Sequence, residues 1–128
     1  MLTPSRLARW LSRATGIGLL LIGIIHGLGY LKVSPLAGSI SDDFREILRV
    51  LWLSFAVHYF ALGGMVLIGA GGRRGSWGLL ALAAAAPLLD GLLQISFLGF
   101  IPPTAILLVV AAIGLAAAFL SRAIDRST

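Results

Sequence analysis

Residues 75–121, "GSWGLLALAAAAPLLDGLLQISFLGFIPPTAILLVVAAIGLAAAFLS", indicate the fold class most clearly, because these 47 residues contain a single charged residue, Asp90. A membrane-spanning helix needs roughly 20 mostly apolar residues, so this stretch is long enough for two spans. Pro102 and Pro103 divide it, since proline lacks an amide donor and is best accommodated at the start of a helix. The pattern predicts spans over about 77–98 and 103–121.

Two further charge-free runs, at positions 14–31 and 50–72, precede this stretch. They predict spans over about 15–31 and 45–70, the second starting near Asp43, which has capping-box spacing to Glu46. Only helices satisfy every backbone polar group within one segment in lipid. Residues 1–128 are therefore expected to form a single integral membrane domain, an all-α four-helix transmembrane bundle.

The composition supports a membrane protein and excludes several other classes. Of the 128 residues, 59% are hydrophobic and 12% are charged, against about 25% charged in typical soluble domains. The absence of cysteine excludes disulfides, iron–sulfur clusters and thiolate metal sites, and no metal site is expected. The net charge of +5 comes from basic residues that flank the apolar runs. Their expected partner is the lipid bilayer, with its anionic headgroups, and not nucleic acid.

The distribution of lysine and arginine predicts the orientation of the chain. With four spans, both termini lie on one side of the membrane. That side carries seven arginines: Arg6, Arg9, Arg13, Arg73, Arg74, Arg122 and Arg126. The other side carries Lys32, Arg45 and Arg49. By the positive-inside rule both termini are expected in the cytoplasm, in a multi-pass protein of the bacterial inner membrane.

Four polar residues within the spans are candidates for a site because of their depth: His26, His58, Asp90 and Gln94. With about 1.5 Å of rise per residue, His26 and Gln94 lie roughly 8–9 Å below the outer boundary, and His58 and Asp90 roughly 14 Å below it. A charge at the bilayer centre costs about 2.5–3.5 kcal/mol, so it usually faces a cavity or a partner. We expect these four residues to form a ligand-binding cluster. The alternative is that Asp90 is structural, hydrogen-bonded to His58 or to hydroxyls.

Small residues and a proline give two further expectations about how the helices pack. Gly23 and Gly27 form a GxxxG pair, with Gly16 on the same helix face, and such residues let another helix approach closely. That helix belongs either to the same chain or to a second copy in a homo-oligomer. Pro87 is expected to kink the third helix and to free a carbonyl near Ala83, as often occurs beside a cavity.

Three stretches carry a resemblance to a known family. "HGLGYL" (26–31), "LRVLWLSFAVHYFALGG" (48–64) and "PLLDGLLQISFLGFIPP" (87–103) resemble the small four-helix bacterial membrane proteins grouped as DoxX-like. The resemblance implies a four-helix membrane fold and, from some relatives, a link to respiratory-chain or quinone-linked redox components. "SRATGIGLLL" (12–21) is similar to the "HRxTG" segment of succinate dehydrogenase membrane anchors, but Ser12 replaces the histidine and those anchors usually have three spans.

Four function classes remain open at this point. The first is a binding protein for a small hydrophobic or amphipathic molecule such as a quinone, a lipid or a sterol-like compound. The second is an intramembrane enzyme in which Asp90 and a histidine act as acid and base. The third is a b-type haem protein with His26 and His58 as axial ligands, although their estimated depths differ. The fourth is a structural subunit or small transporter that works within an oligomer. We favour the first.

Overall fold

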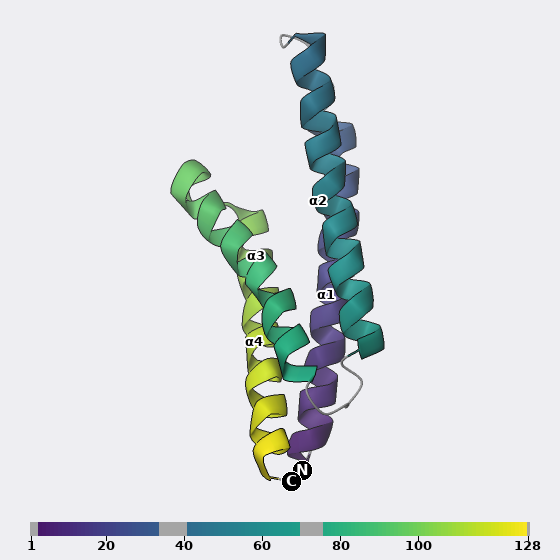
Figure 1. Ribbon diagram of the computed structural model, residues 1–128. Coiled ribbons are helices and arrows are strands. Elements are labelled where there is room, and N and C mark those ends of the chain that lie inside the picture. Colours follow the sequence, from purple (N-terminus) through teal and green to yellow (C-terminus); the bar gives the residue numbers. More distant parts are fainter. Residues whose placement is uncertain (1–2, 34–40, 70–75, 128) are drawn as a thin grey trace.

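The computed structural model describes residues 3–33, 41–69 and 76–127, and these residues form four helices (Figure 1). In chain order the helices are α1 (Pro4–Val33), α2 (Asp42–Gly69), α3 (Ser76–Leu98) and α4 (Pro102–Ser127). Each is long and apolar enough to cross a membrane. The predicted all-α bundle of four transmembrane helices is confirmed, and the chain is a multi-pass membrane protein.

The helices at the two ends of the chain are longer than the predicted spans. Helix α1 begins at Pro4, so the basic lead-in to the first span is helical, and proline suits the first helical position. Helix α4 continues beyond the predicted end at residue 121 to Ser127. Helix α2 begins one residue before Asp43, because the Ser41 carbonyl already accepts the Arg45 amide at 3.0 Å. Arg73 and Arg74, used in the orientation argument, lie outside the described residues.

The four helices form two hairpins, α1–α2 and α3–α4, which are joined mainly through α1 and α4. Figure 1 shows both termini at the same end of the molecule, as an even number of spans requires. Helices α2 and α3 touch little, and they diverge toward the end away from the termini, where α3 leans outward (Figure 1). The bundle is therefore closed near the termini and open between α2 and α3 at the other end. The helix that leans outward, α3, contains Pro87.

Glycine allows α1 and α2 to pack closely. A Cβ atom on Gly16 would lie 2.7 Å from the Leu67 side chain, and one on Gly23 would lie 3.1 Å from the Ala56 carbonyl oxygen. A Cβ atom on Gly63 would lie 2.9 Å from the Gly16 carbonyl oxygen. Such small-residue contacts replace the hydrophobic driving force that helices lack in lipid. The glycines of the first span thus serve packing within the chain.

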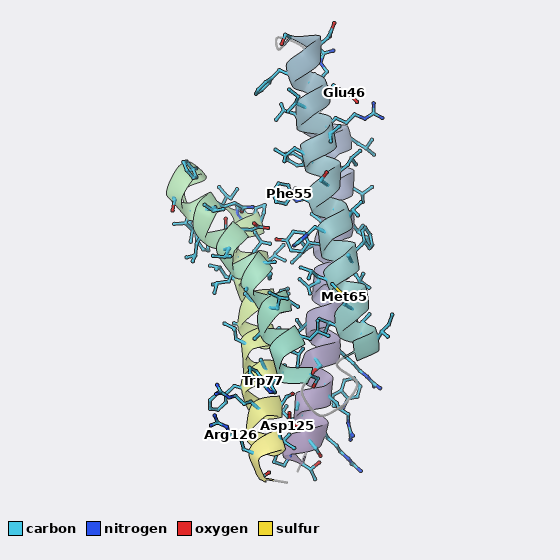
Figure 2. The ribbon with its side chains drawn as sticks, viewed as in Figure 1. Glu46, Phe55, Met65, Trp77, Asp125 and Arg126 are labelled. Atoms are coloured by element: carbon cyan, nitrogen blue, oxygen red, sulfur yellow. The ribbon has the colours of Figure 1, made fainter. Side chains whose placement is uncertain are left out.

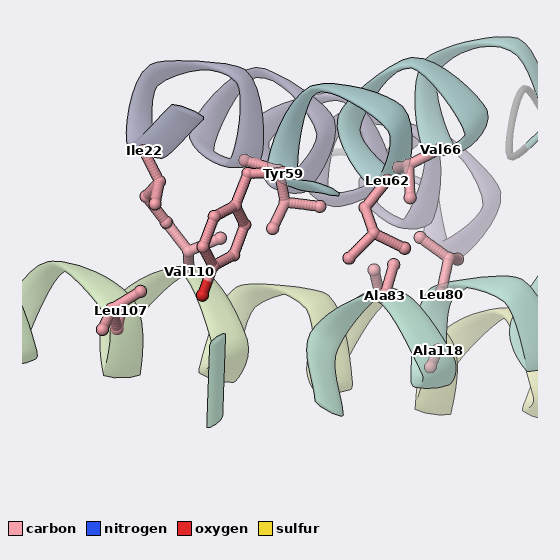
Figure 3. Packing of buried hydrophobic residues seen from close by; sticks show 11 residues of the cluster. Ile22, Tyr59, Leu62, Val66, Leu80, Ala83, Leu107, Val110 and Ala118 are labelled. Atoms are coloured by element: carbon pink, nitrogen blue, oxygen red, sulfur yellow. The ribbon is translucent and has the colours of Figure 1, made fainter. Parts of the chain in front are cut away.

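All four helices contribute to the buried core (Figure 3). Its members are mostly leucine, valine, isoleucine and alanine, with one tyrosine: Leu19, Ile22, Tyr59, Leu62, Val66, Leu80, Ala83, Leu107, Val110, Ala117 and Ala118. Many other large apolar side chains point outward (Figure 2), among them Ile68, which is 85% exposed, and Phe97, which is 82% exposed. This outward apolar surface is what a helix bundle presents to acyl chains.

Aromatic and basic side chains meet near the termini. The Arg13 guanidinium lies 5.8 Å from the centre of the Trp10 ring, and that of Arg122 lies 5.1 Å from the Trp77 ring. Figure 2 shows Trp77 and Arg126 at this end, and Glu46 at the opposite end. Tryptophan with arginine is typical of the membrane–water interface, so one headgroup layer is expected here.

Candidate ligand-binding site

A cavity of about 320 Å³ lies between the two hairpins, and all four helices contribute to its wall. It lies on the side of the core away from the termini, where α2 and α3 diverge. Most of the wall is leucine and aromatic carbon. Five lining residues carry polar side-chain groups: His26 from α1, Trp52 and Tyr59 from α2, and Asp90 and Gln94 from α3.

Helical periodicity brings these side chains together. His26 follows Ile22 by one turn of α1, on the face that packs in the core. Trp52 and Tyr59 lie two turns apart on α2, and Asp90 and Gln94 lie one turn apart on α3, so each pair shares one helix face. Three of the four residues predicted to form the cluster, His26, Asp90 and Gln94, therefore line one cavity.

Tyr59 holds the carboxylate of Asp90. The Tyr59 hydroxyl donates a hydrogen bond to Asp90 Oδ2, and the tyrosine is only 1% exposed. Figure 3 shows its ring crossing the core with the oxygen directed away from α2. Asp90 thus turns inward, and its partner is a hydroxyl, as one alternative expected, and not His58. Sequence reasoning missed Tyr59, although its spacing to Leu62 and Val66 is that of a buried helix face.

The His26 residue is held by aromatic side chains of α2. The Trp52 indole N–H donates a hydrogen bond to the backbone carbonyl of His26. The His26 ring stacks on the Trp52 ring, with centroids 4.8 Å apart and planes at 26°. Phe55 approaches the same imidazole at 5.7 Å in a tilted arrangement. These contacts fix where α1 presents its histidine to the cavity.

Gln94 is oriented by a residue of α4. The Thr104 hydroxyl donates a hydrogen bond of 2.9 Å to Gln94 Oε1, and Thr104 is fully buried. Because this bond uses the carbonyl oxygen of the amide, the NH₂ group of Gln94 remains as its donor. The bond also ties α3 to α4 beside the turn between them.

His58 lies apart from the other three predicted residues. It is exposed and borders a second hollow of about 400 Å³ between α2 and α3, together with Ser54 and Asp90. Asp90 and Phe55 border both hollows, and Figure 2 shows Phe55 on the side of α2 that faces α3. The structure therefore places His58 beside the cavity. The inward position on α2 belongs to Tyr59, the next residue.

Metal and haem ligation gain no support from this geometry. Within residues 3–33, 41–69 and 76–127, no group of three or more histidine, aspartate or glutamate residues could hold a metal ion. His26 and His58 line different hollows. A pair of axial ligands must reach one iron between them, and this pair does not share a cavity.

Comparison of the chain with protein-family models, with curated proteins and with solved structures found no match.

Proposed function

We propose that this chain is a bacterial inner-membrane protein that binds a small hydrophobic or amphipathic molecule, such as a quinone, a lipid or a sterol-like compound. The observation that carries the proposal is the cavity of about 320 Å³, where His26, Asp90 and Gln94 converge among apolar side chains. Small-molecule sites have this construction: roughly 300–1,000 Å³, mostly apolar, with a few polar groups that fix the orientation of the ligand.

The gap between α2 and α3 supplies access from the lipid. The hollow beside His58 adjoins the cavity, since Phe55 and Asp90 border both. A molecule dissolved in the acyl chains can therefore reach the cavity sideways. With both termini in the cytoplasm, as the arginine distribution favours, the cavity lies in the outer half of the membrane.

A matched pair of substitutions on α3 tests the proposal. Leu93 lines the cavity, whereas Leu92, the adjacent and similarly exposed residue, does not. Leu93→Trp fills the cavity, and Leu92→Trp adds the same volume elsewhere on the helix. We expect native mass spectrometry of the protein, extracted from bacterial membranes, to reveal a bound small molecule in the wild type and in Leu92→Trp, and to reveal its loss in Leu93→Trp. Equal retention in the two variants would place binding outside this cavity.

A second candidate is an intramembrane acid–base enzyme. It is favoured by the presence of a carboxylate, a phenol and an imidazole in one cavity wall, contributed by Asp90, Tyr59 and His26, because such groups transfer protons to and from substrates. If it is an enzyme, Asp90→Asn abolishes turnover of the co-purified molecule and leaves its binding measurable.

Membership of the DoxX-like group also remains a proposal. The four-helix architecture is compatible with it. An oligomer is a further proposal, and the mass of the detergent-solubilised protein tests it.

A further inference from the structure

Three hydrogen-bond donors around the cavity already donate to acceptors within the protein. The Tyr59 hydroxyl donates to Asp90, the Trp52 indole to the His26 carbonyl, and the Thr104 hydroxyl to the Gln94 amide oxygen. A ligand that offers only acceptors, such as a neutral quinone, therefore meets few free donors in this wall. The amide of Gln94 and the imidazole of His26 are the ones that remain.

The carboxylate of Asp90 can accept more hydrogen bonds than the one it has. Among the residues that the structure describes, Tyr59 is its one hydrogen-bond partner, and no lysine or arginine lines the cavity. The basic side chains of α2, Arg45 and Arg49, pair instead with Asp42 and Glu46 near the start of that helix. An ionisable residue within a membrane-spanning helix usually faces a cavity or a partner, and a positive ligand would be a partner of opposite charge to the carboxylate.

The aromatic residues of the wall suit a positive group. Trp52, Phe55 and Tyr59 line the cavity together with Asp90, and the His26 ring lies against the rings of Trp52 and Phe55. Aromatic faces attract cations within about 6 Å, tryptophan most strongly, and aromatic cages recognise quaternary ammonium groups in this way. A cation here would gain from the rings and from the carboxylate together, in surroundings of low dielectric constant where both attractions are strengthened.

We propose that the molecule bound in this cavity is a lipophilic cation: an apolar body with an ammonium or quaternary ammonium headgroup, seated between Asp90 and the rings of Trp52 and Phe55. The inference rests on the proposed binding function and names its ligand class. The headgroup occupies the cavity of about 320 Å³, and the apolar body extends through the adjoining hollow of about 400 Å³ toward the lipid.

The test measures binding to the full chain in micelles of dodecyl maltoside, a non-ionic detergent that does not concentrate cations at its surface and carries no ammonium group that would compete with the probe. The probe is tritium-labelled benzyltributylammonium. It is compared with its uncharged analogue, in which carbon replaces nitrogen, and with decylubiquinone as a neutral quinone. Asp90→Asn removes the carboxylate charge with little change in shape. Asp125→Asn is the matched control, because Asp125 lies at the end with the termini, away from the cavity (Figure 2).

We expect the cation to bind the wild type and Asp125→Asn alike, and Asp90→Asn at least about tenfold more weakly, which is about 1.4 kcal/mol. Asp90→Glu, which keeps the charge, should bind more tightly than Asp90→Asn. Equal affinity of the wild type and Asp90→Asn for the cation would overturn the inference. So would saturable binding of decylubiquinone or the uncharged analogue without binding of the cation, and the proposed binding function would then survive.

Failure of all three probes to bind, together with no co-purified molecule in native mass spectrometry, would overturn the proposed function as well. If Asp90→Asn does not fold, the wild-type comparison of the cation with its uncharged analogue decides the question. In that case, preference for the cation supports the inference and equal or weaker binding of the cation refutes it.

Discussion

Gly63 and Gly64 are neighbours on α2, but only Gly63 lies against another helix. A Cβ atom on Gly63 would lie 2.9 Å from the Gly16 carbonyl oxygen and 2.9 Å from Leu20 Cγ, closer than side-chain carbons come in real proteins. A Cβ atom on Gly64 would have no heavy atom of another group within 4 Å. Gly63→Ala should therefore force α1 and α2 apart, whereas Gly64→Ala should be accommodated without movement.

Comparing Gly63→Ala with Gly64→Ala separates the effect of packing on stability from the effect of helix propensity. Both changes replace glycine by alanine in one helix, so both gain up to about 1 kcal/mol of helix propensity. Only Gly63→Ala adds overpacking, which typically costs about 1–3 kcal/mol. The cost should lie toward the upper end of that range, because a backbone oxygen moves only if its helix moves. We expect the free energy of unfolding to be lower in Gly63→Ala than in Gly64→Ala by about 2–3 kcal/mol, the upper part of that range.

Reversible unfolding in mixed micelles, induced by sodium dodecyl sulfate and followed by circular dichroism, measures this difference. Gly64→Ala is the control and should be as stable as the wild type or slightly more stable. If the two variants unfold together, or if Gly64→Ala is the less stable of the two, then the α1–α2 contact is not the one described. The glycines of α1 would in that case have to be explained by contacts outside this chain.

Two further predictions concern the α3–α4 contact and the orientation of the chain. Thr104→Val keeps the shape of the side chain but removes the hydrogen bond to Gln94, so we expect a loss of about 0.6–1.7 kcal/mol in the free energy of unfolding, measured as above, and a smaller loss in Thr104→Ser. Because the chain contains no cysteine, single cysteines can report topology: a membrane-impermeant maleimide should label Ser41→Cys in intact cells and Ser5→Cys only in inverted vesicles. The reverse pattern would place the cavity in the inner half of the membrane.

The predicted spans were close to the helices because length and charge alone decide which segments can cross a bilayer. The third span, predicted at about 77–98, is the helix Ser76–Leu98. The predicted spans and the observed helices differ at the ends of the chain. The apolar pattern stops at the edge of the membrane, but backbone hydrogen bonding continues past it, so α1 begins already at Pro4 and α4 ends only at Ser127.

The candidate site was harder to predict at the level of single side chains. His26, Asp90 and Gln94 were identified as polar groups at suitable depths, and the structure brings them to one cavity. Tyr59 and Trp52 were missed, because an aromatic residue within an apolar run gives no sign of which group its hydroxyl or indole N–H will meet. His58 was assigned to the cluster that Tyr59 in fact joins.

The linear order of charged and apolar residues was sufficient to determine four membrane-crossing helices, because a run of about 20 apolar residues spans a bilayer, and the rise of a helix gave an expected depth for each polar side chain. Which side chains face each other depends on how the helices pack, and the order of residues along the chain does not show it. Successive residues of a helix point in directions about 100° apart. A shift of one residue therefore decides whether His58 or Tyr59 points into the bundle. That direction depends on how closely glycine lets α1 approach α2, and on how far α3 diverges from α2, which are properties of the packed helices together.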